Sequence, residues 1–149
     1  MSLKKIDAYY ENLKKAKKGS VAVGLVQGKA TGRVYGNGNT VVEVGAWNEY
    51  GAGKIPQRSF LRTPFIIKKA DLANTLRSQF KLVAEQGKDA DRALKTVGIE
   101  AENISKEAFV TGGYGQWAAL SPVTIERKGS SQILIDKGIL RSSITSEVR

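Results

Sequence analysis

The sequence lacks both cysteine and histidine. Without cysteine, this chain has no disulfide framework, no thiolate zinc site and no cysteine nucleophile. Without histidine, it also lacks the commonest metal ligand and the commonest general base. Its longest apolar runs, such as residues 21–23 and 65–67, are too short to span a bilayer, and no signal-peptide apolar region follows the first residues. We therefore expect a protein without a metal or cofactor, made in a cytoplasm and not embedded in a membrane.

Positive charge is concentrated in the first half of the chain. The formal net charge is +10, and residues 1–69 hold 13 Lys and Arg against 4 Asp and Glu, whereas residues 70–149 hold 11 against 10. A basic half favours a polyanion or an acidic protein surface as partner. A solubilising lysine-rich face explains the same charge, because the lysines lack interleaved aromatic residues and an arginine-rich element that reads bases.

Hydrophobic spacing predicts one α+β domain over residues 1–149, in which a small, mainly antiparallel sheet packs against two long helices. A basic amphipathic helix is expected within residues 1–19. Strands are expected over residues 21–26 and 40–46, paired antiparallel, and a last strand over 142–148. Residues 27–39 are rich in glycine and asparagine and have few apolar anchors, so they are expected to form a mobile loop.

Helix caps predict where the two long helices lie. Thr63, as N-cap before a proline, begins the first, and Gly87 ends it. Asp89 or Asp91 begins the second, which ends near residues 112–113 and has one apolar face. The members of that face recur every three or four positions: Leu94, Val97, Ala101, Ile104 and Ala108.

Few residues suggest catalysis. Residues 24–30 approach a phosphate-binding loop, but they have one residue too few between the glycines and end on alanine, where a hydroxyl would bind magnesium. Glu49 and Asp136 stand in glycine-flanked turns, where turn-forming and capping roles explain an acid without catalysis. Asp136 is expected to cap a turn through residues 139–141. A hydrolase that uses either carboxylate is thus the least favoured class.

Three separated segments carry motifs that fit together. Residues 47–51 read Trp-Asn-Glu-Tyr-Gly, residues 55–62 read Ile-Pro-Gln-Arg-Ser-Phe-Leu-Arg, and residues 117–141 contain a Pro-Val-Thr-Ile-Glu-Arg-Lys-Gly helix and a Leu-Ile-Asp-Lys-Gly-Ile-Leu turn. In this order and spacing, the chain from about residue 21 onward resembles the minor tail-component family of long-tailed bacteriophages. Members of this family are described as tail-completion, virion-morphogenesis or head–tail joining proteins. Two positions depart from the pattern: Ser59 stands where proline is frequent, and Lys137 where threonine is frequent.

The resemblance implies a non-catalytic structural protein of a tailed bacteriophage or prophage. It would act in tail completion or head–tail joining, in an oligomeric ring with adjoining tail or connector proteins, and would lie in the virion after assembly in the host cytoplasm. The alternative function is a basic nucleic-acid-binding module, although the lysine-rich charge predicts at most weak or non-specific DNA binding. The residues expected to be structural or at interfaces are Glu49, Arg58, Phe60, Arg62, Trp117 and Asp136.

The arginines of the second motif suggest a clamp. Prolines on either side stiffen the segment that carries Arg58 and Arg62, and guanidinium groups bind carboxylates in bidentate fashion. The carboxylate is either internal, from Glu49 or Asp136, or belongs to the next subunit. Trp117 fits equally well as a core anchor or as a contact with a neighbouring subunit.

Overall fold

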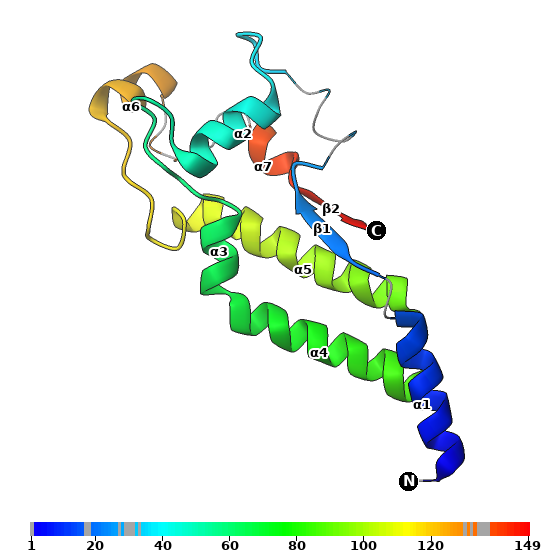
Figure 1. The fold of residues 1–149 in the computed structure, drawn as a ribbon. Coiled ribbons are helices and arrows are strands. Elements are labelled where there is room, and N and C mark those ends of the chain that lie inside the picture. Colours follow the sequence, from blue (N-terminus) through cyan, green and yellow to red (C-terminus); the bar gives the residue numbers. More distant parts are fainter. Residues whose placement is uncertain are drawn as a thin grey trace.

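A hairpin of two long helices forms the spine of an elongated molecule (Figure 1). Helix α4 (Lys69–Gln86) and helix α5 (Ala90–Thr111) run antiparallel, and strands β1 (Val21–Gly24) and β2 (Thr145–Val148) pack on α5 as a two-stranded antiparallel sheet. This confirms the predicted α+β domain. The computed structural model describes residues 2–16, 19–26, 28, 32, 34–129, 131, 133 and 138–149.

The remaining helices lie towards the two ends of this hairpin (Figure 1). Helix α1 (Leu3–Ala16) packs beside the turn that joins α4 to α5. The opposite end holds four short helices: α2 (Val41–Tyr50), α3 (Arg62–Ile67), α6 (Pro122–Lys128) and α7 (Ile139–Ser142). Within the described residues, none of the helices is long and apolar enough to cross a membrane.

The caps predicted for the long helices are mostly confirmed. Gly87 ends α4 and Gly112 ends α5, both in the left-handed conformation that glycine adopts at low cost. Asp89 is the N-cap of α5, and its carboxylate accepts the N–H of Arg92 at 2.7 Å. The short helix α6 likewise begins after Ser121 and ends at glycine, as expected.

The strand predicted over residues 40–46 is wrong, because these residues begin α2. Thr40 and Glu43 form a reciprocal capping box, in which the Thr40 hydroxyl accepts the Glu43 N–H and the Glu43 carboxylate accepts the Thr40 N–H. The valine alternation that suggested a strand is overridden by this start signal. Strand β1 therefore pairs with β2 at the other end of the chain.

The helix predicted from Thr63 to Gly87 is divided in two. Helix α3 begins two residues earlier than expected, at Arg62, and its N-cap is Leu61 in place of Thr63. A break at Lys68 (φ −96°, ψ 18°) separates α3 from α4. The earlier start follows from the Glu49 carboxylate and the Ser59 hydroxyl, which lie outside the helix and accept its first N–H groups.

The sheet lies close against α5 because residue 98 has no side chain. A Cβ there would lie 2.7 Å from the Ser146 hydroxyl and 3.0 Å from a Val21 methyl group. The predicted apolar face of α5 is buried as expected. Seven residues form the main core cluster at the end that holds α2 and α7: Val41, Phe60, Ala108, Phe109, Trp117, Leu140 and Ile144.

Helix α1 confirms the predicted basic helix but leaves much of its apolar stripe uncovered. Leu3 is 79% exposed and Tyr10 is 60% exposed. Within the predicted loop 27–39, Tyr35 packs against the core cluster, so this segment has an apolar anchor that the prediction did not include. Residues 27, 29–31 and 33 lie outside the described residues, and the mobility of the loop stays a prediction.

Candidate functional site

Segments from three of the motifs meet at the end of the molecule that holds α2. The last turn of α2 supplies Glu49, the segment before α3 supplies Arg58 and Ser59, and the loop after α5 supplies Trp117. We call this group, with the backbone N–H groups of residues 60–62, the Glu49 cradle. Two backbone-directed bonds join the first two motifs directly: Arg58 donates its N–H to the Asn48 carbonyl at 2.7 Å, and the Gln57 amide donates to the Glu49 carbonyl at 3.1 Å.

Glu49 is the centre of the cradle. Its side chain is buried, with the residue only 5% exposed, and its carboxylate accepts four hydrogen bonds. One comes from the Ser59 hydroxyl at 2.7 Å, and three come from backbone N–H groups of residues 60, 61 and 62, at 2.8, 3.0 and 3.1 Å. The N–H groups of residues 61 and 62 lie at the start of α3, where a helix leaves donors unsatisfied and favours negative charge, and that of residue 60 comes just before it. The carboxylate of one helix therefore caps another helix.

Ser59 extends this cap. Its hydroxyl accepts the Thr63 N–H at 2.9 Å while it donates to Glu49. Together the two side chains satisfy the first turn of α3, which explains why that helix begins before Thr63. The sequence analysis gave Ser59 only as a departure from the family pattern, where proline is frequent, and missed this role. A serine four residues before a threonine is too common a pattern to have identified it.

Arg58 holds the loop after α5. The residue is 6% exposed, and its guanidinium donates to the Ala118 carbonyl from Nε and Nη2, at 3.2 and 3.1 Å, and from Nη2 to the Ala119 carbonyl at 3.4 Å. Burial lowers the pKa of Arg58 from its ordinary value, because the charged form loses hydration. An arginine side chain nevertheless stays charged in proteins, so it is a strong donor to both carbonyls.

Trp117 is a core anchor, one of the two roles predicted for it. Its indole N–H donates to the Ser59 carbonyl at 3.1 Å, and its ring meets Phe109 edge to face, with centroids 5.6 Å apart. Phe60, also predicted to be structural, packs on Phe109 with centroids 5.4 Å apart. A Cβ at Gly113 would overlap the Trp117 ring, so only glycine permits this contact.

The predicted internal clamp between an arginine and Glu49 is wrong. The Arg58 guanidinium donates to carbonyl oxygens, and the Glu49 carboxylate accepts from N–H groups and a hydroxyl. The two side chains therefore do not pair with each other. Arg62 is exposed, and its guanidinium lies over the Tyr50 ring, 5.4 Å from the centroid. Asp136 lies outside the described residues, so its predicted cap and any pairing with an arginine stay predictions.

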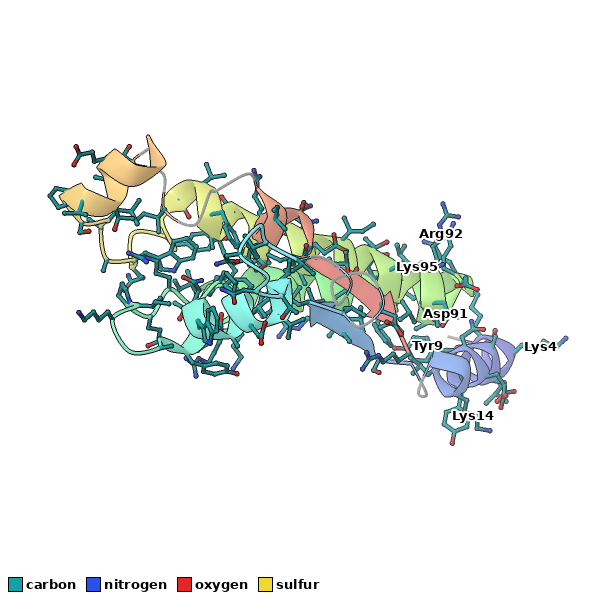
Figure 2. The ribbon with its side chains drawn as sticks, turned by 90° about the horizontal axis from the view of Figure 1, so that it is seen from above. Lys4, Tyr9, Lys14, Asp91, Arg92 and Lys95 are labelled. Carbon is teal, nitrogen blue, oxygen red and sulfur yellow. The ribbon has the colours of Figure 1, made fainter. Side chains whose placement is uncertain are left out.

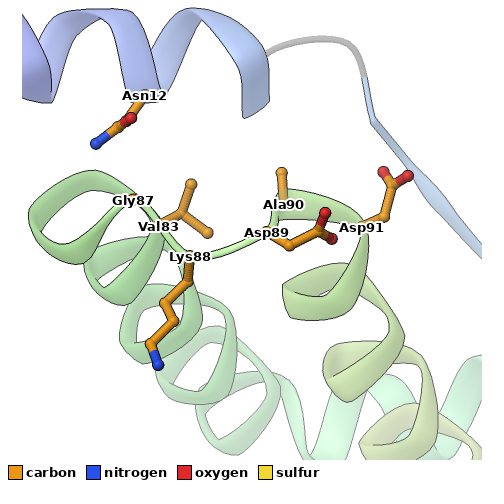
Figure 3. A pocket seen from close by; sticks show the side chains of 7 residues that line it. All are labelled: Asn12, Val83, Gly87, Lys88, Asp89, Ala90 and Asp91. Carbon is orange, nitrogen blue, oxygen red and sulfur yellow. The ribbon is translucent and has the colours of Figure 1, made fainter.

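The opposite end of the molecule has a surface pocket of about 380 Å³ between α1 and the α4–α5 turn (Figure 3). Two of the polar side chains that line it, those of Asn12 and Asp89, already have structural partners. Asn12 donates to the Ala84 carbonyl at 3.3 Å, and Asp89 caps α5. In the part of the chain that the structure describes, no group of three or more Asp and Glu side chains is placed to hold a metal ion.

A scan against models of known protein families, a search of curated proteins and a search of solved structures each find no match to this chain. The chemistry of the cradle must therefore be judged from its own geometry. Its carboxylate, its guanidinium and its indole N–H all bind backbone groups of the same chain. This arrangement fixes the relative positions of α2, α3 and the loop after α5.

Proposed function

We propose that this chain is a structural protein of a tailed bacteriophage or prophage that acts in tail completion or head–tail joining as part of an oligomeric ring. The observation that carries the proposal is the ordered set of motifs that resembles the minor tail-component family. The first two motifs and Trp117 belong to one hydrogen-bonded unit, the Glu49 cradle. The cradle needs residues from each of these motifs, and this shared need explains why the motifs occur together in one sequence.

The bonding of the cradle suits a structural role. Buried polar networks rigidify a protein when every member has a partner. Glu49 and Arg58 meet that condition through backbone groups of segments that are distant in the sequence. Rigid positioning of loops and helix ends favours a component that presents fixed surfaces to neighbours.

The cradle end also presents apolar side chains to solvent. Val123 on α6 is 75% exposed, and Tyr50, Ile66 and Val110 are each more than 65% exposed. Exposed apolar side chains of this size support contacts with other proteins, whether copies of this chain or adjoining tail and connector proteins. Such contacts would place the protein in the virion, after assembly in the host cytoplasm.

Deletion of the gene from its native genome tests the proposal. Particles released after induction should then include filled heads without joined tails, or tails of abnormal length, when viewed by electron microscopy. Expression of the gene from a plasmid should restore complete particles. Normal infectious particles from the deletion strain would overturn the proposal.

Measurements on the purified protein separate the structural role from the nucleic-acid alternative. Native mass spectrometry at increasing protein concentration should show a closed oligomer of defined size. Duplex DNA should bind weakly at physiological salt, and the affinity should fall steeply as salt rises, because only phosphate contacts contribute. A tight, sequence-specific complex of a monomer with DNA would favour the nucleic-acid-binding module instead.

A further inference from the structure

The outer edge of β1 carries backbone groups that its ladder with β2 does not use. Ser20 and Arg149 exchange both backbone hydrogen bonds at 2.8 Å, one position before the strand pair begins. Bonded and non-bonded pairs alternate in an antiparallel ladder. Val21 and Val23 therefore direct their N–H and C=O groups away from β2. Within the described part of the chain, no hydrogen bond is made to these outward groups.

The outer edge of β2 differs, because a side chain covers it. Glu102 on α5 accepts the Ser146 N–H and the Ser146 hydroxyl, both at 2.7 Å. Lys106 donates to the same carboxylate group at 2.8 Å and holds it in place. The middle of the outer edge of β2 is thus closed to another strand, whereas that of β1 is not.

The open edge also lacks the devices that usually protect edge strands. Residues 19–26 read Gly-Ser-Val-Ala-Val-Gly-Leu-Val, without a charge or a proline. Proteins commonly block exposed edges with lysine, proline or an inward charge. Figure 2 shows β1 on the outer side of the sheet, between α2 and α1.

We propose that β1 pairs edge to edge with β1 of a second copy of this chain, giving an antiparallel sheet in the order β2-β1-β1-β2. The partner is a second copy because a short, uncharged edge is complementary to itself across a two-fold axis, and because Glu102 closes the other edge. This contact is two-fold symmetric, so it joins two copies and no more. A ring needs a different, head-to-tail contact, and the dimer proposed here does not rest on the proposed function.

The register of this pairing follows from the outward groups. Val21 and Val23 supply the hydrogen bonds, so each faces the other in the second copy, and Ala22 faces its own counterpart as a non-bonded pair. Non-bonded pairs have Cα atoms about 4.5 Å apart, within the range that a disulfide accepts. Val21 points at α5, where it lies close to Gly98, so the Ala22 side chain lies on the opposite face of the sheet.

Disulfide cross-linking tests this register, since the chain has no cysteine of its own. Under mild oxidation, Ala22→Cys should form disulfide-linked dimers at least about tenfold faster than Ala70→Cys, because the pairing raises the local thiol concentration. Ala70 is an exposed alanine on α4 and serves as the matched control. Equal rates for the two variants would overturn the proposal.

Two proline variants test the same edge without cysteine. Proline is tolerated on an edge strand where its missing N–H would face outward. Val23→Pro should therefore keep the fold and raise the dimer dissociation constant about tenfold or more. Ala22→Pro should instead lower the melting temperature, because the Ala22 N–H faces Glu147 in the ladder. Sedimentation equilibrium measures the dimer, and circular dichroism measures the fold.

The four-residue edge is small, so we expect a dimer with a dissociation constant of roughly micromolar or weaker. A wild-type chain that stays monomeric at millimolar concentration would overturn the inference. So would a dimer that Val23→Pro leaves intact while circular dichroism shows a folded chain. Neither result changes what is expected when the gene is deleted from its genome. The proposed dimer and the proposed function in the virion can therefore fail separately.

Discussion

The two ends of the molecule differ in how their side chains are used. At the Glu49 cradle, buried polar groups bind the backbone of distant segments, and aromatic rings pack around them. At the distal end, defined as α1 with the α4–α5 turn, the apolar stripe of α1 is largely exposed, and Asn12 of α1 donates a hydrogen bond to the Ala84 carbonyl of α4. Figure 2 shows the labelled side chains Lys4, Lys14, Arg92 and Lys95 projecting from this end.

This difference indicates where the stability of the chain resides. A buried charge is costly unless hydrogen bonds satisfy it, so the loss of one partner in the cradle strands the others. Replacement of an exposed apolar residue changes the free energy of unfolding only a little. We therefore expect the effects of substitution to fall steeply from the cradle to the distal end.

Glu49→Ala should have the largest effect. The substitution leaves the Ser59 hydroxyl and three backbone N–H groups, at and just before the start of α3, without their acceptor. We expect a loss of about 3–4 kcal/mol in the free energy of unfolding, measured by urea denaturation. Glu49→Gln keeps one oxygen acceptor and should cost less. A loss below about 1 kcal/mol for Glu49→Ala would show that the cap does not stabilise α3.

Gly113→Ala should have the next largest effect, with Gly115→Ala as its matched control. Both glycines have positive φ, 68° and 79°, so both alanines are strained. Only residue 113 faces the Trp117 ring, whereas a Cβ at residue 115 meets nothing within 4 Å. We expect Gly115→Ala to cost about 1 kcal/mol and Gly113→Ala about 1–3 kcal/mol more. Equal losses in thermal melts would show that the loop moves to accommodate the ring.

Glu102→Gln should sharpen the comparison through its pH dependence. Burial acts to raise the pKa of Glu102. Hydrogen bonds from Lys106 and Ser146, together with the Lys106 charge, outweigh this effect, so the pKa lies below its ordinary value. A depressed pKa in the folded state adds stability above the unfolded pKa, and this stability is lost as the pH falls through the folded pKa.

The wild-type chain should therefore lose stability on acidification, and Glu102→Gln should lose less of it over the same acid range. At neutral pH the variant should be less stable by about 1 kcal/mol. Melting temperatures between neutral and acidic pH measure both effects. Parallel pH curves for the two proteins would mean that the Glu102 charge does not stabilise β2.

Ile6→Asn should have the smallest effect. Ile6 lies on the exposed stripe of α1 and is 47% exposed. We expect the free energy of unfolding of the monomer to change by less than about 0.5 kcal/mol. A loss comparable to that of Gly113→Ala would show that the distal end is packed as firmly as the cradle, and the contrast between the ends would not hold.

Elements defined by local chemistry were predictable. Gly87, Asp89 and Gly112 mark helix ends because their preferences depend on neighbours a few residues away. The apolar face of α5 was predicted for the same reason, since its period reports burial directly. The prediction for residues 40–46 was wrong because two local signals compete there. Valine alternation favours a strand, whereas the capping box of Thr40 and Glu43 favours a helix. Because the capping box satisfies backbone donors at the helix start, these residues form α2.

The cradle was predictable only in part. Sequence alone determined that an α+β domain with two long helices forms, and it predicted that Glu49, Arg58, Phe60 and Trp117 are structural or lie at interfaces. Only the tertiary structure decided the partners: Glu49 binds the first N–H groups of α3, and Arg58 binds carbonyls of the loop after α5. A carboxylate and a guanidinium in one sequence suggest each other, because opposite charges attract. Once buried, each instead serves the unsatisfied backbone groups that the fold places beside it, since leaving those groups unpaired costs more.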